Sequence, residues 1–177
     1  MLKNTTNSYG TGTKIFHWII GIIIIVMLAV GYIMTNKGNF AFKWQLYDLH
    51  KATGVTLLFL VSLRLIWRLM NIKVTLPGDL PSWQKIASHV NFIILYILMF
   101  AMPLSGLLMS LLGGRNINIY GLFTIEPFAK NILLAKIFKN IHENAAPLLC
   151  ALIALHITAA LYHHFIRKDN VLIRMIR

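Results

Sequence analysis

Four long apolar stretches alternate with polar, basic connectors along this chain of 177 residues. Each stretch is close to the roughly 20 residues that a helix needs to cross a bilayer. The stretches cover residues 14–34, 49–69, 86–112 and 143–165. The pattern predicts an all-α membrane protein, in which residues 1–177 form a single integral-membrane domain built as a bundle of four transmembrane helices.

The charges in the connectors predict how the bundle is oriented. An even number of spans places both termini on one side, and Lys and Arg are enriched on the cytoplasmic side of a membrane. Ten basic residues lie on the side of the termini and seven on the other, so both termini are expected to be cytoplasmic. The outer connectors are nevertheless basic, because their seven cations, Lys37 among them, face only three acidic residues.

Two shorter features modify this outline. Pro103 and Gly106 lie within the third span, where they are expected to kink the helix. The longest connector covers residues 113–141, and Phe128 to Asn140 within it is expected to form a short helix that lies on the membrane.

The composition agrees with a multi-pass protein of the bacterial inner membrane. Hydrophobic residues make up 58% of the chain and charged residues only 12%, where soluble domains carry about a quarter. Lys and Arg outnumber Asp and Glu by 17 to 5. On so apolar a chain this excess is expected to flank membrane segments, so no nucleic acid partner is predicted. The first apolar run is too long for a signal-peptide core, and Cys150 alone excludes an internal disulfide.

The histidines are the candidate functional residues, because all seven lie in or at the ends of the spans, where ionisable groups are costly. His142 and His156 are fourteen residues apart in one span, which is close to four helical turns and about 21 Å. Both imidazoles therefore lie on the same face at opposite depths. In the predicted topology His50 lies near the outer side with His142, and His17 lies near the inner side with His156.

This arrangement predicts two axial pairs, each holding one haem. His50 and His142 would bind the outer haem, His17 and His156 the inner haem, with irons about 21 Å apart along the membrane normal. Filling both axial positions with histidine suits electron transfer, because no position on the iron remains open. Each of these histidines taken alone could instead be structural.

The residue one turn after each histidine supports this choice. A haem edge must pass close to the helix that bears its ligand, and a small residue at position i+4 makes room for it. The four proposed ligands are followed there by Gly21, Gly54, Ala146 and Ala160. The other three histidines, His89, His163 and His164, are followed by Ile93, Arg167 and Lys168.

Other ionisable residues near the inner side have open roles. His89 could be a structural donor, a quinone-site residue or an alternative ligand, and His163 could contact a quinone head group or lie at the interface. Arg64 is fourteen residues after His50, so it lies on the same face at the inner depth. It could bind inner-haem propionates or an anionic quinone species, or it could extend to lipid phosphate as an anchor.

Six segments of the sequence resemble the bacterial di-haem cytochrome b561 family. They are KIFHW at 14–18, LHKATG at 49–54, RLIWRL at 64–69, MPLSGLLM at 102–109, IHE at 141–143 and LHITAALYHHFIRKDNVLIRMI at 155–176. The resemblance implies four helices, two haem b groups and quinone exchange at the inner side. It also implies ligands on helices one, two and four, which correspond to His17, His50, His142 and His156.

The resemblance further implies an activity, because one member of the family passes electrons from superoxide at the outer face to ubiquinone. A similar role would make this chain a superoxide:quinone oxidoreductase, a superoxide oxidase. Superoxide is a small anion, and a cationic outer surface would raise its rate of encounter. The candidate steering residues are Lys51, Lys130, Lys136 and Lys139.

Two other functions remain open at this point. In the first, the chain is an electron-transfer cytochrome b subunit, and a periplasmic redox protein docks on the 113–141 connector and reduces the same haems. In the second, the chain is a histidine-containing transporter or metal permease. The near absence of carboxylates within the spans disfavours the second, because ion coupling usually needs them.

Overall fold

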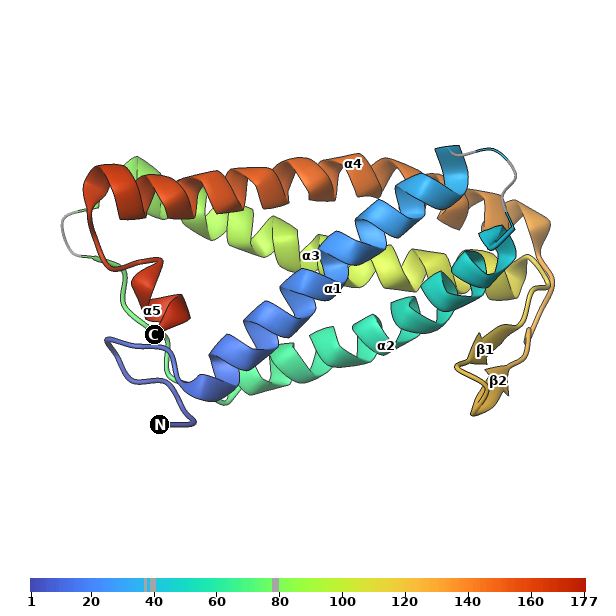
Figure 1. Cartoon of the computed structure of the whole chain (residues 1–177), viewed down its shortest axis with the longest axis horizontal. Helices are drawn as coiled ribbons and strands as arrows, with labels where there is room; N and C mark the ends of the chain where they lie inside the picture. Colours follow the sequence, from blue (N-terminus) through green and yellow to red (C-terminus); the bar gives the residue numbers. More distant parts are fainter. Residues whose placement is uncertain (37, 39–40, 78–79) are drawn as a thin grey trace.

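The computed structural model describes residues 1–36, 38, 41–77 and 80–177, and Lys37 lies outside them. Four long helices dominate these residues (Figure 1). They are α1 (Thr11–Asn36), α2 (Lys43–Leu69), α3 (Ser82–Leu112) and α4 (Ile132–Tyr162). Each is long and apolar enough to cross a membrane. The predicted bundle of four membrane-spanning helices is therefore confirmed.

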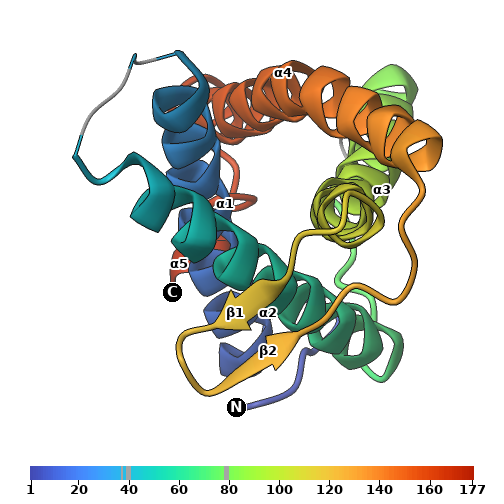
Figure 2. The same ribbon diagram turned by 90° about the vertical axis from the view of Figure 1, so that its right-hand side faces the viewer.

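The four helices follow one another around the bundle, with α1 beside α2, α2 beside α3, and α3 beside α4 (Figure 2). Their inward faces meet in one apolar cluster. Its buried members include Ile20, Val61, Leu98 and Leu149, one from each helix. Many outward apolar side chains stay exposed, for example Phe59 at 63%. This pattern fits helices that face lipid, which solvates apolar side chains as well as a core does.

The fourth helix differs from the prediction. The prediction of a separate helix on the membrane surface at 128–140 is wrong, because α4 begins at Ile132 and continues without interruption into the span. Asn131 caps it, since the side-chain oxygen accepts a hydrogen bond from the backbone N–H of Leu134 at 3.1 Å. At about 1.5 Å per residue, its 31 residues extend some 46 Å, well beyond a hydrocarbon core of about 30 Å.

The chain is also not purely helical. β1 (Ile117–Ile119) and β2 (Phe123–Ile125) form an antiparallel hairpin between α3 and α4, with Ile117 opposite Ile125. The turn is made by Tyr120 and Gly121, whose φ angles are both positive. The hairpin leans against α2, because the hydroxyl of Tyr120 donates to Thr53 Oγ1 at 3.2 Å. Ile117 is 1% exposed, so the hairpin closes one end of the bundle.

Both termini lie at the opposite end of the molecule from the hairpin (Figure 1). There α4 continues into a π-helical turn, η1 (His163–Arg167), and the chain ends in α5 (Ile173–Ile176). The last residues fold back on α1, since the indole N–H of Trp18 donates to the carbonyl of Met175 at 3.1 Å. Placement of this end on the cytoplasmic side stays a prediction.

The third helix bends in its middle, as both views show (Figures 1 and 2). Pro103 lies inside α3 and is buried. Because proline lacks an N–H and its ring collides with the carbonyl four residues earlier, it is the usual cause of such a bend. The expected kink in this span is therefore present.

Candidate functional site

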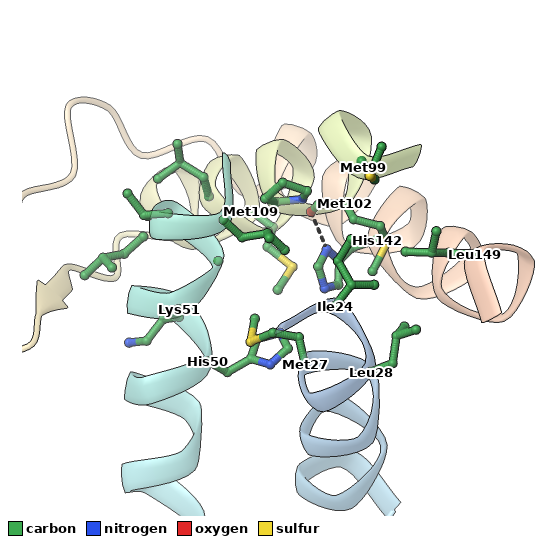
Figure 3. A pocket seen from close by; sticks show the side chains of 17 residues that line it. Ile24, Met27, Leu28, His50, Lys51, Met99, Met102, Met109, His142 and Leu149 are labelled. Atoms are coloured by element: carbon green, nitrogen blue, oxygen red, sulfur yellow. Dashed lines mark hydrogen bonds between the residues drawn. The ribbon is translucent and has the colours of Figure 1, made fainter. Parts of the chain in front are cut away.

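Two of the seven histidines face one another at the end of the bundle that carries the hairpin. His50 on α2 and His142 on α4 have ring centroids 6.2 Å apart, with planes inclined by 82°. A pocket between the four helices contains both rings (Figure 3). Its walls are otherwise almost entirely apolar, and they include Met27, Met99 and Leu149. The sequence predicted this pair, and the structure brings it together.

The ring of His142 is held by α3. Its Nδ1 lies 2.9 Å from the carbonyl oxygen of Met102 and 3.2 Å from Oγ of Ser105. A carbonyl oxygen can only accept, so Nδ1 carries the proton and donates. The other ring nitrogen, Nε2, therefore keeps its lone pair, and it lies on the side of the ring toward His50 (Figure 3). A metal-binding histidine usually makes a second hydrogen bond of this kind through the nitrogen that does not bind the metal.

The ring of His50 has a different environment. Its Nδ1 is buried and has no hydrogen-bond partner in the part of the chain that the structure describes. Gly31 of α1 lies beside it, since a Cβ at Gly31 would be 3.5 Å from Cε1 of His50. An unpaired buried polar atom is costly. Its presence beside an apolar pocket is typical of a site that receives a further group.

A second histidine pair lies toward the end that carries the termini. The ring centroids of His17 on α1 and His156 on α4 are 6.0 Å apart, with planes inclined by 54°. Arg64 of α2 lies against this pair, with Nη2 at 3.2 Å from Nδ1 of His17. Its guanidinium also contacts Sδ of Met99 at 3.9 Å and lies 5.6 Å from the centroid of the Tyr96 ring. The side chain of Arg64 thus points into the bundle.

The spacing within both pairs suits one metal ion between two imidazoles. Metal–nitrogen bonds to imidazole are about 2 Å long, and a ring centroid lies about 1.1 Å behind the binding nitrogen, so two axial rings should be about 6.3 Å apart. The observed 6.0 and 6.2 Å are close to this value. There is also room beside the ligands, because a Cβ at Gly21 would meet no other part of the described chain within 4 Å. Gly54 lines the pocket that contains His50 and His142. The residues present therefore fit a haem in each position.

The remaining histidines do not join these pairs. His89 is exposed on α3, and it makes no hydrogen bond, ion pair or ring contact within the described ranges. His164 packs edge-on against Phe165, with ring centroids 4.8 Å apart. His163 begins η1, and its Nδ1 donates to Oδ2 of Asp169 at 2.6 Å. The structure thus gives His163 an acidic partner that the sequence analysis did not identify.

The carboxylate of Asp169 is the centre of a small polar cluster beyond the end of α4. Its second oxygen accepts from the backbone N–H of Val171 at 3.1 Å, and Nε of Arg167 is 3.4 Å from Oδ2. Burial acts to raise the pKa of Asp169, but hydrogen bonds from His163, Val171 and Arg167 outweigh it. The net effect is a pKa below the ordinary value.

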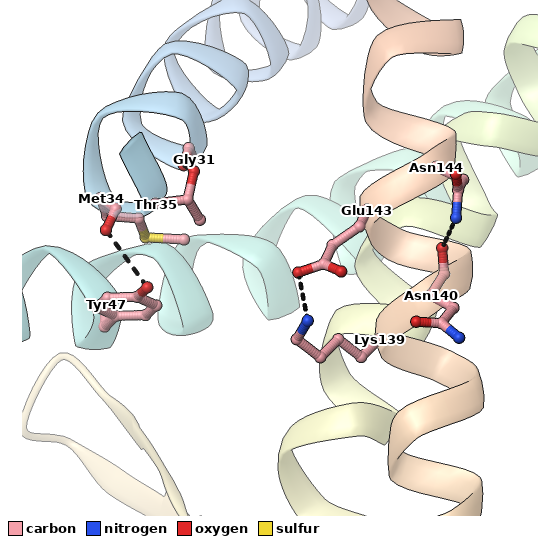
Figure 4. A network of polar contacts seen from close by, with 8 residues as sticks. All are labelled: Gly31, Met34, Thr35, Tyr47, Lys139, Asn140, Glu143 and Asn144. Atoms are coloured by element: carbon pink, nitrogen blue, oxygen red, sulfur yellow. Dashed lines mark hydrogen bonds and ion pairs between the residues drawn. The ribbon is translucent and has the colours of Figure 1, made fainter. Parts of the chain in front are cut away.

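The four lysines proposed to steer an anion fall into two groups. Lys51 and Lys139 are paired with carboxylates, at 2.8 Å from Asp48 and 2.7 Å from Glu143. Figure 4 shows the second pair on α4. Lys130 and Lys136 are exposed, and neither forms an ion pair among the residues described. Of the four, Lys130 and Lys136 are therefore the ones whose charge no carboxylate of the described residues neutralises.

The contacts of α3 are the part of the site that the sequence analysis missed. In the third span, His89 was the one residue for which the sequence predicted a possible functional role. The available signals were the MPLSGLLM segment and the expected kink, which together mark Met102, Ser105 and Gly106. These residues lie against His142.

Comparison with known proteins gives the family. The model of a family described as prokaryotic cytochrome b561 matches residues 8–177. Cytochrome b561 homolog 2 of Escherichia coli (strain K12) is 32% identical, over 98% of this chain and 93% of the relative. Cytochrome b561 homolog 1 of the same organism is 33% identical, over 93% and 94% respectively. A protein of Yersinia pestis named probable superoxide oxidase CybB is 26% identical, over 90% of each chain. This chain therefore belongs to the prokaryotic cytochrome b561 family, a family of multi-pass membrane electron-transfer proteins with b-type haem.

Proposed function

We propose that this protein is a di-haem cytochrome of the bacterial inner membrane that carries electrons from superoxide at the periplasmic side to ubiquinone at the cytoplasmic side. The observation that supports it most is the presence of two facing histidine pairs, His50 with His142 and His17 with His156, near opposite ends of one bundle. A single pair would leave half of the membrane without a redox centre.

Each pair would hold one haem b through its two imidazoles. When bound, haem b supplies a one-electron redox centre, and with both axial positions filled it offers no open position to a substrate. Packing of the bundle holds the histidines in place. The proposed ligands lie on α1, α2 and α4, so they can face one another only when these helices pack together. The apolar walls around His50 and His142 exclude water from this part of the site.

Arg64 supplies a positive charge beside the inner pair. Its guanidinium points toward His17 and away from lipid, which favours a role in binding an anion over the role of a lipid anchor. Arginine can only donate, so in the present contact Nδ1 of His17 accepts. Coordination by a neutral His17 through Nε2 requires a proton on Nδ1. Arg64 would therefore release His17, and its guanidinium would be free for a haem propionate.

The donor side is supported by charge and by one relative. Lys130 and Lys136 present positive charge that carboxylates do not neutralise, which would raise the rate at which an anion arrives. The Yersinia pestis relative is named for superoxide oxidation. In the proposed reaction two superoxide ions are each oxidised to dioxygen, and one quinone takes up the two electrons and two protons.

The acceptor side would supply these protons. His163 donates from Nδ1 to Asp169, which orients the ring and leaves Nε2 available for proton exchange. We propose that His163 contacts the quinone head group, with Asp169 as the residue that orients it. His89 is a second candidate for this contact, because it is exposed on α3 near the first residues of that helix.

A second function differs only in the electron donor. In it, a periplasmic redox protein docks at the outer end and reduces the same haems. The observation that favours it is the hairpin, whose Leu122 and Phe123 are 80% and 59% exposed. Exposed apolar side chains near basic residues are typical of surfaces that bind a protein partner.

Mixing the purified protein with superoxide in a stopped-flow spectrometer tests the choice of donor. The superoxide-oxidase function predicts rapid haem reduction followed by formation of ubiquinol when ubiquinone is present. It also predicts a rate that falls as salt screens the outer charge. Haem that stays oxidised in superoxide, but is reduced by a co-purifying periplasmic protein, would instead establish the second function.

A further inference from the structure

We propose that the Met102–Gly106 segment of α3 positions His142 and lowers the redox potential of the outer haem, so that electrons move from the outer to the inner site. This inference rests on the proposed function, since it takes His142 as a haem ligand. It assigns a role to α3, which contributes none of the four proposed ligands.

A hydrogen bond joins the ring of His142 to α3. Nδ1 donates to the carbonyl oxygen of Met102, at 2.9 Å, with Oγ of Ser105 as a second acceptor at 3.2 Å. Ser105 is 2% exposed and its hydroxyl donates to the same carbonyl at 2.9 Å, so it has one fixed orientation. A lone pair of Oγ is therefore available to the imidazole N–H.

The backbone of α3 also contacts the ring of His142 at Gly106. A Cβ at Gly106 would lie 3.1 Å from Cε1 and 3.3 Å from Nδ1 of His142. Any larger residue at this position would be in a tighter contact with the ring than van der Waals packing normally allows, so glycine favours this close approach of α3. Pro103 follows Met102 directly in the sequence and is buried, and it bends α3 beside the ring of His142. Backbone, hydroxyl and glycine together determine where the imidazole lies and which of its nitrogens faces His50.

The electronic consequence follows from the direction of the hydrogen bond. An imidazole that donates from Nδ1 to an oxygen gains electron density, becomes a stronger ligand and stabilises ferric iron. The potential of the outer haem is thereby lowered. Beside the inner pair the neighbour of His17 is the cation Arg64, which favours the reduced state of a nearby redox centre. The outer haem would thus have a lower redox potential than the inner haem, which is the order that electron flow from outside to inside requires.

Redox titration of the full-length, haem-loaded protein tests the inference, with Ser105→Ala as the main variant. Ser110→Ala is the matched control. Ser110 is also buried in α3, at 3%, and its hydroxyl donates to the carbonyl of Gly106, with no hydrogen bond to the imidazole among the described residues. We expect Ser105→Ala to retain both haems and to shift one component of the titration to higher potential. The other component, and both components of Ser110→Ala, should stay at the wild-type values.

Gly106→Ala provides an independent readout. The added methyl group would press on the ring of His142 and shift it by a few tenths of an ångström, so the electron paramagnetic resonance signal of one low-spin haem should change while the other keeps its g values. Two haems with unchanged potentials in Ser105→Ala and unchanged g values in Gly106→Ala would overturn the inference and leave the proposed function standing. A wild-type protein that binds one haem would overturn both.

Discussion

The imidazole of His17 on α1 faces that of His156 on α4 with 6.0 Å between ring centroids, although 139 positions separate them in the chain. The two helices share few backbone contacts, so the rings meet across an intervening space. The Gly21 position opens onto this space. In the proposed function, the inner haem occupies this space.

Replacement of Gly21 by phenylalanine should exclude the inner haem. The phenylalanine side chain would fill the open volume at Gly21, which lies one helical turn after His17. Haem content should therefore fall by half, while the helical content is kept. Pyridine haemochrome assay and circular dichroism measure the two quantities. Ile22→Phe is the control, because Ile22 is 58% exposed and the larger ring would face outward. Full haem content in Gly21→Phe would contradict the proposed position of the inner haem.

Arg64→Gln should lower the potential of the inner haem. Removal of a guanidinium that lies 3.2 Å from His17 takes away a positive charge that favours the reduced state. Redox titration should show one component at lower potential, and it should be the component that Ser105→Ala leaves unchanged. Arg68→Gln is the control, because Arg68 is exposed and stacks on Phe92 at 3.7 Å. Equal effects of the two substitutions would indicate a general surface charge effect.

Loss of the unpaired outer lysines should slow the reaction with superoxide. The double variant Lys130→Gln/Lys136→Gln should reduce the second-order rate several-fold at low salt and flatten its dependence on ionic strength. Lys139→Gln should have less effect, since Lys139 is already 2.7 Å from Glu143. Stopped-flow measurements over a series of salt concentrations provide the comparison. A rate that does not change with salt in the wild-type protein would exclude steering.

The Asp169 cluster should stabilise the C-terminal end in a pH-dependent way. The folded-state pKa of Asp169 lies below its ordinary value, so its contribution is present at neutral pH. That contribution falls as the pH drops below about 3.9, the unfolded pKa, and is lost below the folded pKa. Asp169→Asn should therefore lower the Tm at pH 7 and cause a smaller change near pH 3. An equal decrease at both values would mean that the ionised carboxylate is not the stabilising form.

The pairing of the histidines could be predicted because helical periodicity converts spacing into direction. Fourteen residues between His142 and His156 return the chain to the same face, and span order assigns each a partner. Apolar length alone was sufficient to predict the four helices. Their ends were less predictable, as the early start of α4 shows, because this helix begins at Ile132, before the apolar stretch predicted from residue 143.

Other parts of the site have no comparable signal in the sequence. The hairpin strands are three residues each, too short for an alternating pattern to emerge. The contact between Met102 and His142 uses a backbone carbonyl, which every residue has, so no residue type indicates it. The pairing of His163 with Asp169 depends on the π-helical turn and on the left-handed Lys168, which bring residues six apart together.

The most direct test of the central claim is the haem-to-protein ratio of the purified wild-type protein and of the four single His→Ala variants at positions 17, 50, 142 and 156. The claim predicts two haems in the wild-type protein and the loss of one in each variant. In the two variants of a pair, the haem that remains should have the same potential. A wild-type ratio of one, or a variant among the four that keeps two low-spin haems, would contradict the claim.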